Sequence, residues 1–150
     1  AGYVRKRQRC RRRRPRRGAA AEVRRSAAQA DFSGNAPRAL RILDGLRGEG
    51  REPPLILWAL LNDLRALSRV TQQDPEGRNL DAVFRAEQVW SNRQGPLRKA
   101  IGRLRRSEID ALIASAARAD RVAKGNLRGD AWVEITGLVA RIAGVPLAAA

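Results

Sequence analysis

The chain has 150 residues, with 31 Lys and Arg against 15 Asp and Glu, one cysteine, and neither histidine nor methionine. Without histidine it lacks the usual general base and the commonest metal ligand, and a single cysteine excludes internal disulfides and cysteine-rich zinc sites. These counts argue against most classes of enzyme and metalloprotein. The length suffices for one domain, and 43% apolar residues is ordinary for a globular core.

Positive charge is concentrated at the N-terminus. Residues 1–17 hold ten basic residues and no acid, so only +6 of the net charge of +16 remains for the rest of the chain. Such a segment cannot bury apolar area, and we predict a disordered Arg-rich arm over residues 1–25. Three interpretations stay open: an arm that binds nucleic-acid phosphates, a solvated tail, or the product of a shifted reading frame in a GC-rich gene.

Beyond the arm, apolar residues recur at helical spacing, and nothing alternates as strands do. Asn35 is predicted to cap a helix that has Pro37 in its first turn and ends at Gly48. Pro53 and Pro54 then open a longer helix. Its apolar residues cover most of the helix circumference, so we expect it to be the central, most buried helix.

In the middle of the chain the predicted helices are shorter and are separated by segments that disfavour helix. The polar stretch over 71–79 is predicted to be a loop, followed by a short helical segment around Phe84. Gly95 and Pro96 indicate a second break, after which Pro96 would lie in the first turn of the next helix.

Two further capping patterns delimit the last helices. Ser107 with Asp110 three residues later forms a variant of the capping box, and Gly125 would end that helix. A last helix is expected to begin near Asp130 and to end at Gly144. About five to six helices joined by short loops predict an all-α bundle over residues 26–150.

No catalytic, cofactor-binding or metal-binding residues are predicted. There is no glycine-rich phosphate loop, and Cys10 has no histidine to activate it. The acidic pairs of the sequence fall in the first turns of predicted helices, where negative charge favours the helix dipole. No apolar run is long enough to span a bilayer, so we expect no membrane span and a cytoplasmic location.

Two sets of residues are candidates for contact with other molecules. On a helix that begins at Pro96, four basic residues would lie near one side and could contact nucleic-acid backbone or an acidic partner. These residues are Arg98, Lys99, Arg103 and Arg106, and a solvated helix face is the alternative interpretation. Trp58, Trp90 and Trp132 have aliphatic neighbours at helical spacing, which favours core or interface anchors over base-stacking platforms.

Five segments carry more information together than any one does alone. They are RALRILDGLRGEG (38–50), EPPLILWALLNDLRAL (52–67), VWSNRQGPLRKAIGRL (89–104), AARADRVAKG (116–125) and AWVEITGLVARIAG (131–144). In this order they resemble the C-terminal helical domain of the bacterial DNA polymerase III delta subunit, of the clamp-loader family. The resemblance covers about residues 36–147, and the arm departs from it.

The resemblance implies a role in DNA replication through protein assembly. It implies that this collar domain packs with the equivalent domains of gamma/tau-type and delta-prime-type subunits in the complex that loads the sliding clamp onto DNA. We therefore expect Trp58 and Trp90 at the subunit interface, with Arg93 at its rim. DNA would be reached only through the complex, and clamp contact is not expected because no counterpart of the clamp-contacting domain is present.

Two alternatives remain beside this interpretation. The chain could be a small basic nucleic-acid-binding protein that uses the Arg-rich arm, although the absence of methionine and the unusual arm favour a fragment or frame-shifted product of a longer gene. Whether it counts as an enzyme is left open. The family belongs to a DNA-directed DNA polymerase (nucleotidyltransferase) holoenzyme, whereas this sequence itself looks non-catalytic.

Overall fold

The structure is a computed structural model that describes Gly18, Phe32 and residues 34–145. Within these residues the chain forms helices and no strand, which confirms the predicted all-α bundle. The helices of this part are α2 (Ala36–Gly48), α3 (Pro53–Gln73), α4 (Leu80–Ala86), α5 (Ser91–Ile101), α6 (Arg106–Ala123) and α7 (Ala131–Ile142). The predicted arm over 1–25, apart from Gly18, and its boundary with the helical domain lie outside the described residues.

The first two of these helices begin where the sequence predicts. The side chain of Asn35 accepts a hydrogen bond from the backbone N–H of Arg38 at 3.0 Å. This bond gives one of the free N–H groups of the first turn a partner. α2 then ends at Gly48. Pro53 and Pro54 occupy the first turn of α3, where a missing N–H leaves no helical bond unmade.

α3 is the central helix of the bundle, as predicted. It packs against α4, α5, α6 and α7, and it buries more residues than any other described helix. Its buried apolar residues are Ile56, Leu57, Ala59, Leu60, Leu64, Ala66, Leu67 and Val70. The core therefore sits around α3, with shorter helices covering it.

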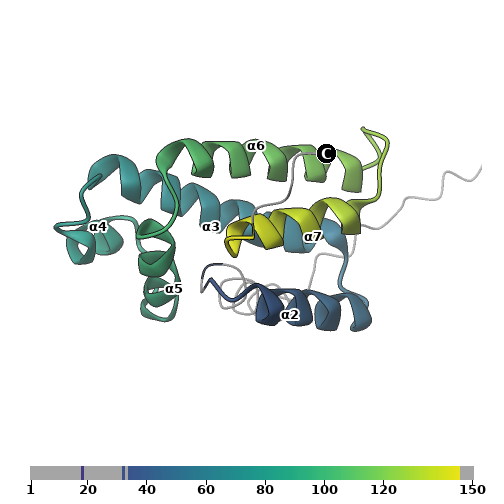
Figure 1. The fold of residues 1–150 in the computed structure, drawn as a ribbon, viewed down its shortest axis with the longest axis horizontal. Coiled ribbons are helices and arrows are strands. Elements are labelled where there is room, and N and C mark those ends of the chain that lie inside the picture. The colour runs from purple at the N-terminus through teal and green to yellow at the C-terminus, as the bar shows by residue number, and fades with distance from the viewer. Residues whose placement is uncertain (1–17, 19–31, 33, 146–150) are drawn as a thin grey trace, which may run out of the picture.

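The helices divide into a main bundle and an end piece (Figure 1). α3 and α6 run antiparallel and side by side, α7 packs against both of them, and α2 lies against α7. The two short helices α4 and α5 sit at the end of the bundle where α3 terminates, and both contact α3. The connection between α4 and α5 is thereby held close to the C-terminal half of α3.

α5 differs from its predicted form. It begins at Ser91 and carries Pro96 inside it, so the expected break at Gly95 and Pro96 does not occur. The proline removes only the bond that the carbonyl of Asn92 would accept, and Asn92 is exposed to water, which can hydrate that carbonyl. The helix ends at Ile101 instead of continuing past residue 104.

α6 also begins earlier than predicted. Its first residue is Arg106, and the carboxylate of Glu108 accepts from the backbone N–H of Arg105 at 2.7 Å. The predicted capping box from Ser107 to Asp110 is wrong, because Ser107 already lies within the first helical turn and a capping residue must have non-helical backbone angles. The predicted end is confirmed: α6 stops just before Gly125, whose positive φ lies in the left-handed region that favours glycine.

α7 begins as predicted at a capping aspartate. The side chain of Asp130 accepts from the backbone N–H groups of Trp132 at 2.8 Å and Val133 at 3.3 Å. Trp132 is half-buried against the core, and the guanidinium of Arg47 lies 5.4 Å from the centre of its ring. Among the helices of the described residues, none is both long and apolar enough to cross a bilayer.

Candidate subunit interface

Two exposed tryptophans line the same hollow on the surface of the chain. Trp58 is 45% exposed and Trp90 is 74% exposed. Such exposure is unusual for side chains of this size. They border a hollow of about 330 Å³ together with Asn62, Ala66, Arg69, Glu87, Gln88, Val89 and Arg93. The structure therefore brings together Trp58, Trp90 and Arg93, the three residues that the sequence suggested for a subunit interface.

One wall of this tryptophan hollow is a face of α3. Trp58, Asn62, Ala66 and Arg69 line it, and their spacings of four, four and three residues place them on one side of a helix. The opposite side of α3 is buried in the core. The wall is thus the side of this helix turned away from the core, with Trp58 and Arg69 exposed and Ala66 buried.

The other wall is the connection between α4 and α5. Gln88 follows the end of α4 with a positive φ, in the left-handed conformation for which glycine is the usual residue. The backbone N–H of Val89 then bonds the carbonyl of Phe84 at 2.8 Å, and the Val89 side chain is buried. This tight turn directs the chain so that the next residue, Trp90, stands exposed at the start of α5.

A buried ion pair joins the two walls. The guanidinium of Arg93, on the first turn of α5, pairs with the carboxylate of Asp63 on α3, and their side chains are 12% and 1% exposed. A buried carboxylate is stable only when it is paired, which explains why the arginine turns inward. The expected place of Arg93 at an interface rim, where side chains stay accessible to solvent, does not fit this burial: the side chain lines the hollow and fixes α5 to α3.

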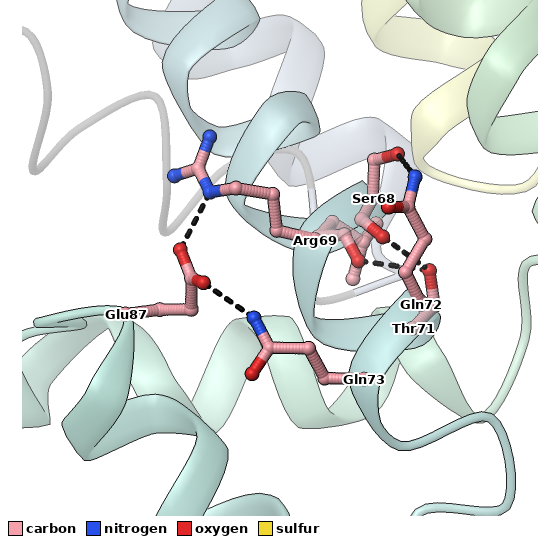
Figure 2. A network of polar contacts seen from close by, with 7 residues as sticks. Ser68, Arg69, Thr71, Gln72, Gln73 and Glu87 are labelled. Atoms are coloured by element: carbon pink, nitrogen blue, oxygen red, sulfur yellow. Dashed lines mark hydrogen bonds and ion pairs between the residues drawn. The ribbon is translucent and has the colours of Figure 1, made fainter.

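Glu87, which also lines the hollow, bonds to two side chains of α3 (Figure 2). Its carboxylate accepts from Arg69 Nε and from Gln73 Nε2, each at 2.5 Å, and so links the α4–α5 connection to the last turns of α3. The hydrogen bond from Arg69 lowers the pKa of Glu87 below its ordinary value of 4.5, despite the opposing effect of burial. The Glu87 side chain is 17% exposed and that of Arg69 is 51% exposed, so the pair is open to solvent on the arginine side.

This lowered pKa predicts a dependence of stability on pH. A carboxylate with a lower pKa in the folded chain stabilises the fold above its unfolded pKa, and that contribution disappears as the pH falls from about 4.5 through the lowered value. We expect Glu87→Gln to remove part of the loss of stability on acidification. Urea unfolding at neutral pH and at several acidic values measures this, and an identical acid dependence in both proteins would contradict it.

The four basic candidates are not brought together as predicted. α5 ends at Ile101, so Arg103 lies in the following loop and Arg106 is the first residue of α6. The common helix face that the sequence suggested for Arg98, Lys99, Arg103 and Arg106 does not form, because the helix that would have carried it starts and stops earlier.

Two of these basic side chains are engaged within the chain. Arg98 pairs with Asp81, and its guanidinium lies 5.0 Å from the centre of the Phe84 ring. Arg103 donates to the carbonyl of Phe32 at 3.1 Å and to the carbonyl of Ile142 at 3.4 Å. Both arginines thus connect elements of this chain, while Lys99 and Arg106 are exposed.

The second, larger hollow has a different character. It measures about 630 Å³ and is lined by Arg103, Leu104, Ser107, Glu108, Ala111, Leu112, Arg141, Gly144 and Val145. Its charged side chains are already used: Arg103 donates to backbone carbonyls, Arg141 donates to the hydroxyl of Ser115 at 2.8 Å, and Glu108 accepts the capping bond of α6. Within residues 34–145, no three side chains of the metal-ligating types gather at one place.

Sequence reasoning missed Asp63, Asn62, Arg69 and Glu87. Only Asp63 carried a signal, because it lies three residues after Leu60 and four before Leu67, on the apolar face of a helix. A charge at such a position indicates a buried partner. The partner itself lies two helices further along the chain, on α5, and leaves no local pattern.

Comparison with known proteins assigns the chain to a family. Residues 27–149 match the family model described as the processivity clamp loader gamma complex DNA pol III C-term. The chain is 32% identical over 115 residues to DNA polymerase III subunit delta of Escherichia coli, covering 77% of this chain and 33% of that protein. It is 29% identical over 119 residues to the same subunit of Haemophilus influenzae, covering 73% and 34%.

These matches confirm the resemblance drawn from the five sequence segments. This chain spans about a third of the length of the two curated relatives. It belongs to the family of C-terminal domains of the DNA polymerase III processivity clamp loader gamma complex.

Proposed function

We propose that this chain acts in DNA replication as an assembly domain of a bacterial clamp loader. In this role it packs against the equivalent domains of gamma/tau-type and delta-prime-type subunits, in the cytoplasm, and reaches DNA only through the complex. Family membership supports the assignment to the clamp loader. The observation that carries the assembly role is the pair of exposed tryptophans on one hollow.

Exposed tryptophans at a preformed hollow are typical of a binding surface. Each buries a large apolar area when covered, and tryptophan is enriched among the few residues that dominate the affinity of protein interfaces. Trp90 in particular is 74% exposed, and a partner that covered it would remove this apolar surface from water. The tryptophan hollow is therefore the part of this chain that we assign to contact with another subunit.

We assign no catalytic step to this chain. Three carboxylates near helix starts already have partners within the chain: Glu108 caps α6, Asp130 caps α7, and the Glu134 carboxylate lies 3.5 Å from Nε of Arg118. Nucleotidyl transfer by the holoenzyme would then be carried out by other subunits. The alternative of a nucleic-acid-binding protein gains no support from the described residues, where Arg98 and Arg103 bond within the chain.

Co-purification tests the proposal. The 150-residue chain is expressed together with the other clamp-loader subunits of the same organism, and we expect it to co-elute with them at micromolar concentrations. Removing the segment 1–17 should leave co-elution unchanged, because the proposed contact surface lies on α3 and α5. A chain that elutes alone, or that binds only through this N-terminal segment, would contradict the proposal.

A further inference from the structure

The exposed face of α3 carries positive charge beside the tryptophan hollow. Trp58, Asn62, Arg65 and Arg69 lie at positions i, i+4, i+7 and i+11, which share one side of a helix. Arg65 is exposed, and no ion pair or hydrogen bond joins its side chain to another residue in the described part of the chain. The stripe therefore combines an aromatic anchor site with an uncompensated cation.

Acidic groups that could neutralise Arg65 are used elsewhere. Asp63 is the one acid on α3, and it is buried in its pair with Arg93. Glu87 is held by Arg69 and Gln73 at the far end of the hollow. A partner that covers this stripe would bury the guanidinium of Arg65 without compensation unless it supplied an acid of its own.

From this arrangement we infer that the partner segment is an amphipathic acidic helix of another collar subunit, an inference that rests on the proposed function. One apolar side chain of this helix enters the hollow between Trp58 and Trp90. A carboxylate two helical turns away lies opposite Arg65. Two turns of a helix rise about 10.8 Å, so the same spacing on both helices keeps the two contacts in register.

The hollow itself favours a protein helix over nucleic acid. Single-stranded nucleic acids also stack on aromatic rings beside arginines, but they bring a phosphate at every nucleotide. Arg69 and Arg93 on this hollow are already paired with Glu87 and Asp63, so Arg65 is the one cation of the α3 stripe left to neutralise an incoming acidic group. A helix that offers one acid at the distance of Arg65 matches this single cation, whereas a strand with a phosphate at every nucleotide does not.

The test is a charge reversal with a matched control. The affinity of the full chain for the purified gamma/tau–delta-prime complex is measured at about 50 mM and about 300 mM salt. Arg65→Glu is expected to weaken binding at least ~10-fold at low salt and less at high salt, because like charges then face each other. Arg121→Glu reverses an exposed arginine of α6 and should change the affinity less than about twofold.

The outcomes separate this inference from the proposed function. If the wild-type chain does not bind the complex, the proposed function fails. Suppose instead that the wild-type chain binds and that Trp90→Ala abolishes binding. If Arg65→Glu then binds as tightly as the wild type, the inference of an acidic partner helix is overturned. If the chain alone sediments as a dimer that Trp90→Ala dissociates, the occupant is a second copy of the chain, which also overturns it.

Discussion

Asp63→Ala should lower the free energy of unfolding by about 3 kcal/mol, since breaking a buried ion pair from one side leaves the other charge without its counter-charge. The guanidinium of Arg93 would stay in its largely buried site without the Asp63 carboxylate. Chemical denaturation followed by circular dichroism measures the change. Asn62→Ala, on the neighbouring position that lines the hollow, serves as the control and should change stability by less than about 1 kcal/mol.

A double variant distinguishes the ion pair from simple loss of packing. Replacing both partners by leucine removes both charges and refills the site with apolar side chains, a change that is often neutral or stabilising. Asp63→Leu with Arg93→Leu should therefore recover most of the stability that Asp63→Ala loses. If the double variant is as unstable as the single one, the charge pair is not the cause of the loss.

The second large effect is expected on assembly. Trp58→Ala with Trp90→Ala should weaken binding to the other clamp-loader subunits by at least ~100-fold, because truncating a central interface tryptophan typically costs about 2 kcal/mol or more and about 1.4 kcal/mol corresponds to a factor of ten. The unfolding midpoint should move little, because neither side chain belongs to the buried core cluster. Isothermal titration with the partner subunits measures the affinity.

A control on another surface makes this result specific. Val133, on α7, is 68% exposed and lies outside the tryptophan hollow. Val133→Ala removes exposed apolar surface of the chain without touching that hollow, so its affinity should match that of the wild type. Binding that survives the double tryptophan change would place the interface elsewhere on the bundle.

The boundaries that could be predicted from the sequence are those set by local chemistry. Asn35 and Asp130 cap their helices through bonds to residues two or three positions away, so their sequence neighbourhood contains the whole interaction. Pro53 and Pro54 fix backbone angles that suit a first turn. The central place of α3 in the core was predictable for the same reason, because apolar periodicity is visible within a single helix.

The errors arise where the surroundings overrule a local preference. Gly95 and Pro96 disfavour a helix, yet α5 continues through them because Leu97 and Ala100 are buried and hold its following turn in place. The predicted basic face depended on a helix that begins at Pro96, and the structure contains no such helix. Once α5 is placed from Ser91 to Ile101, Arg103 and Arg106 no longer belong to it.

The candidate interface was only partly predictable. Large aromatics with aliphatic neighbours can be core or interface, and only burial separates Trp132, which packs on the core, from Trp58 and Trp90. The meeting of the two exposed tryptophans depends on how α5 docks on α3. That docking is fixed by Asp63 and Arg93, which are distant in sequence.

The position of Trp58 on the central helix has a further consequence for binding. Leu57 and Ala59, its two neighbours in the chain, are both completely buried, so the backbone beneath the tryptophan is held by the core before any partner arrives. Binding there orders side chains but not backbone, and the conformational entropy lost on association is correspondingly small. The hollow is preorganised, and a partner needs no rare open state of this domain in order to dock.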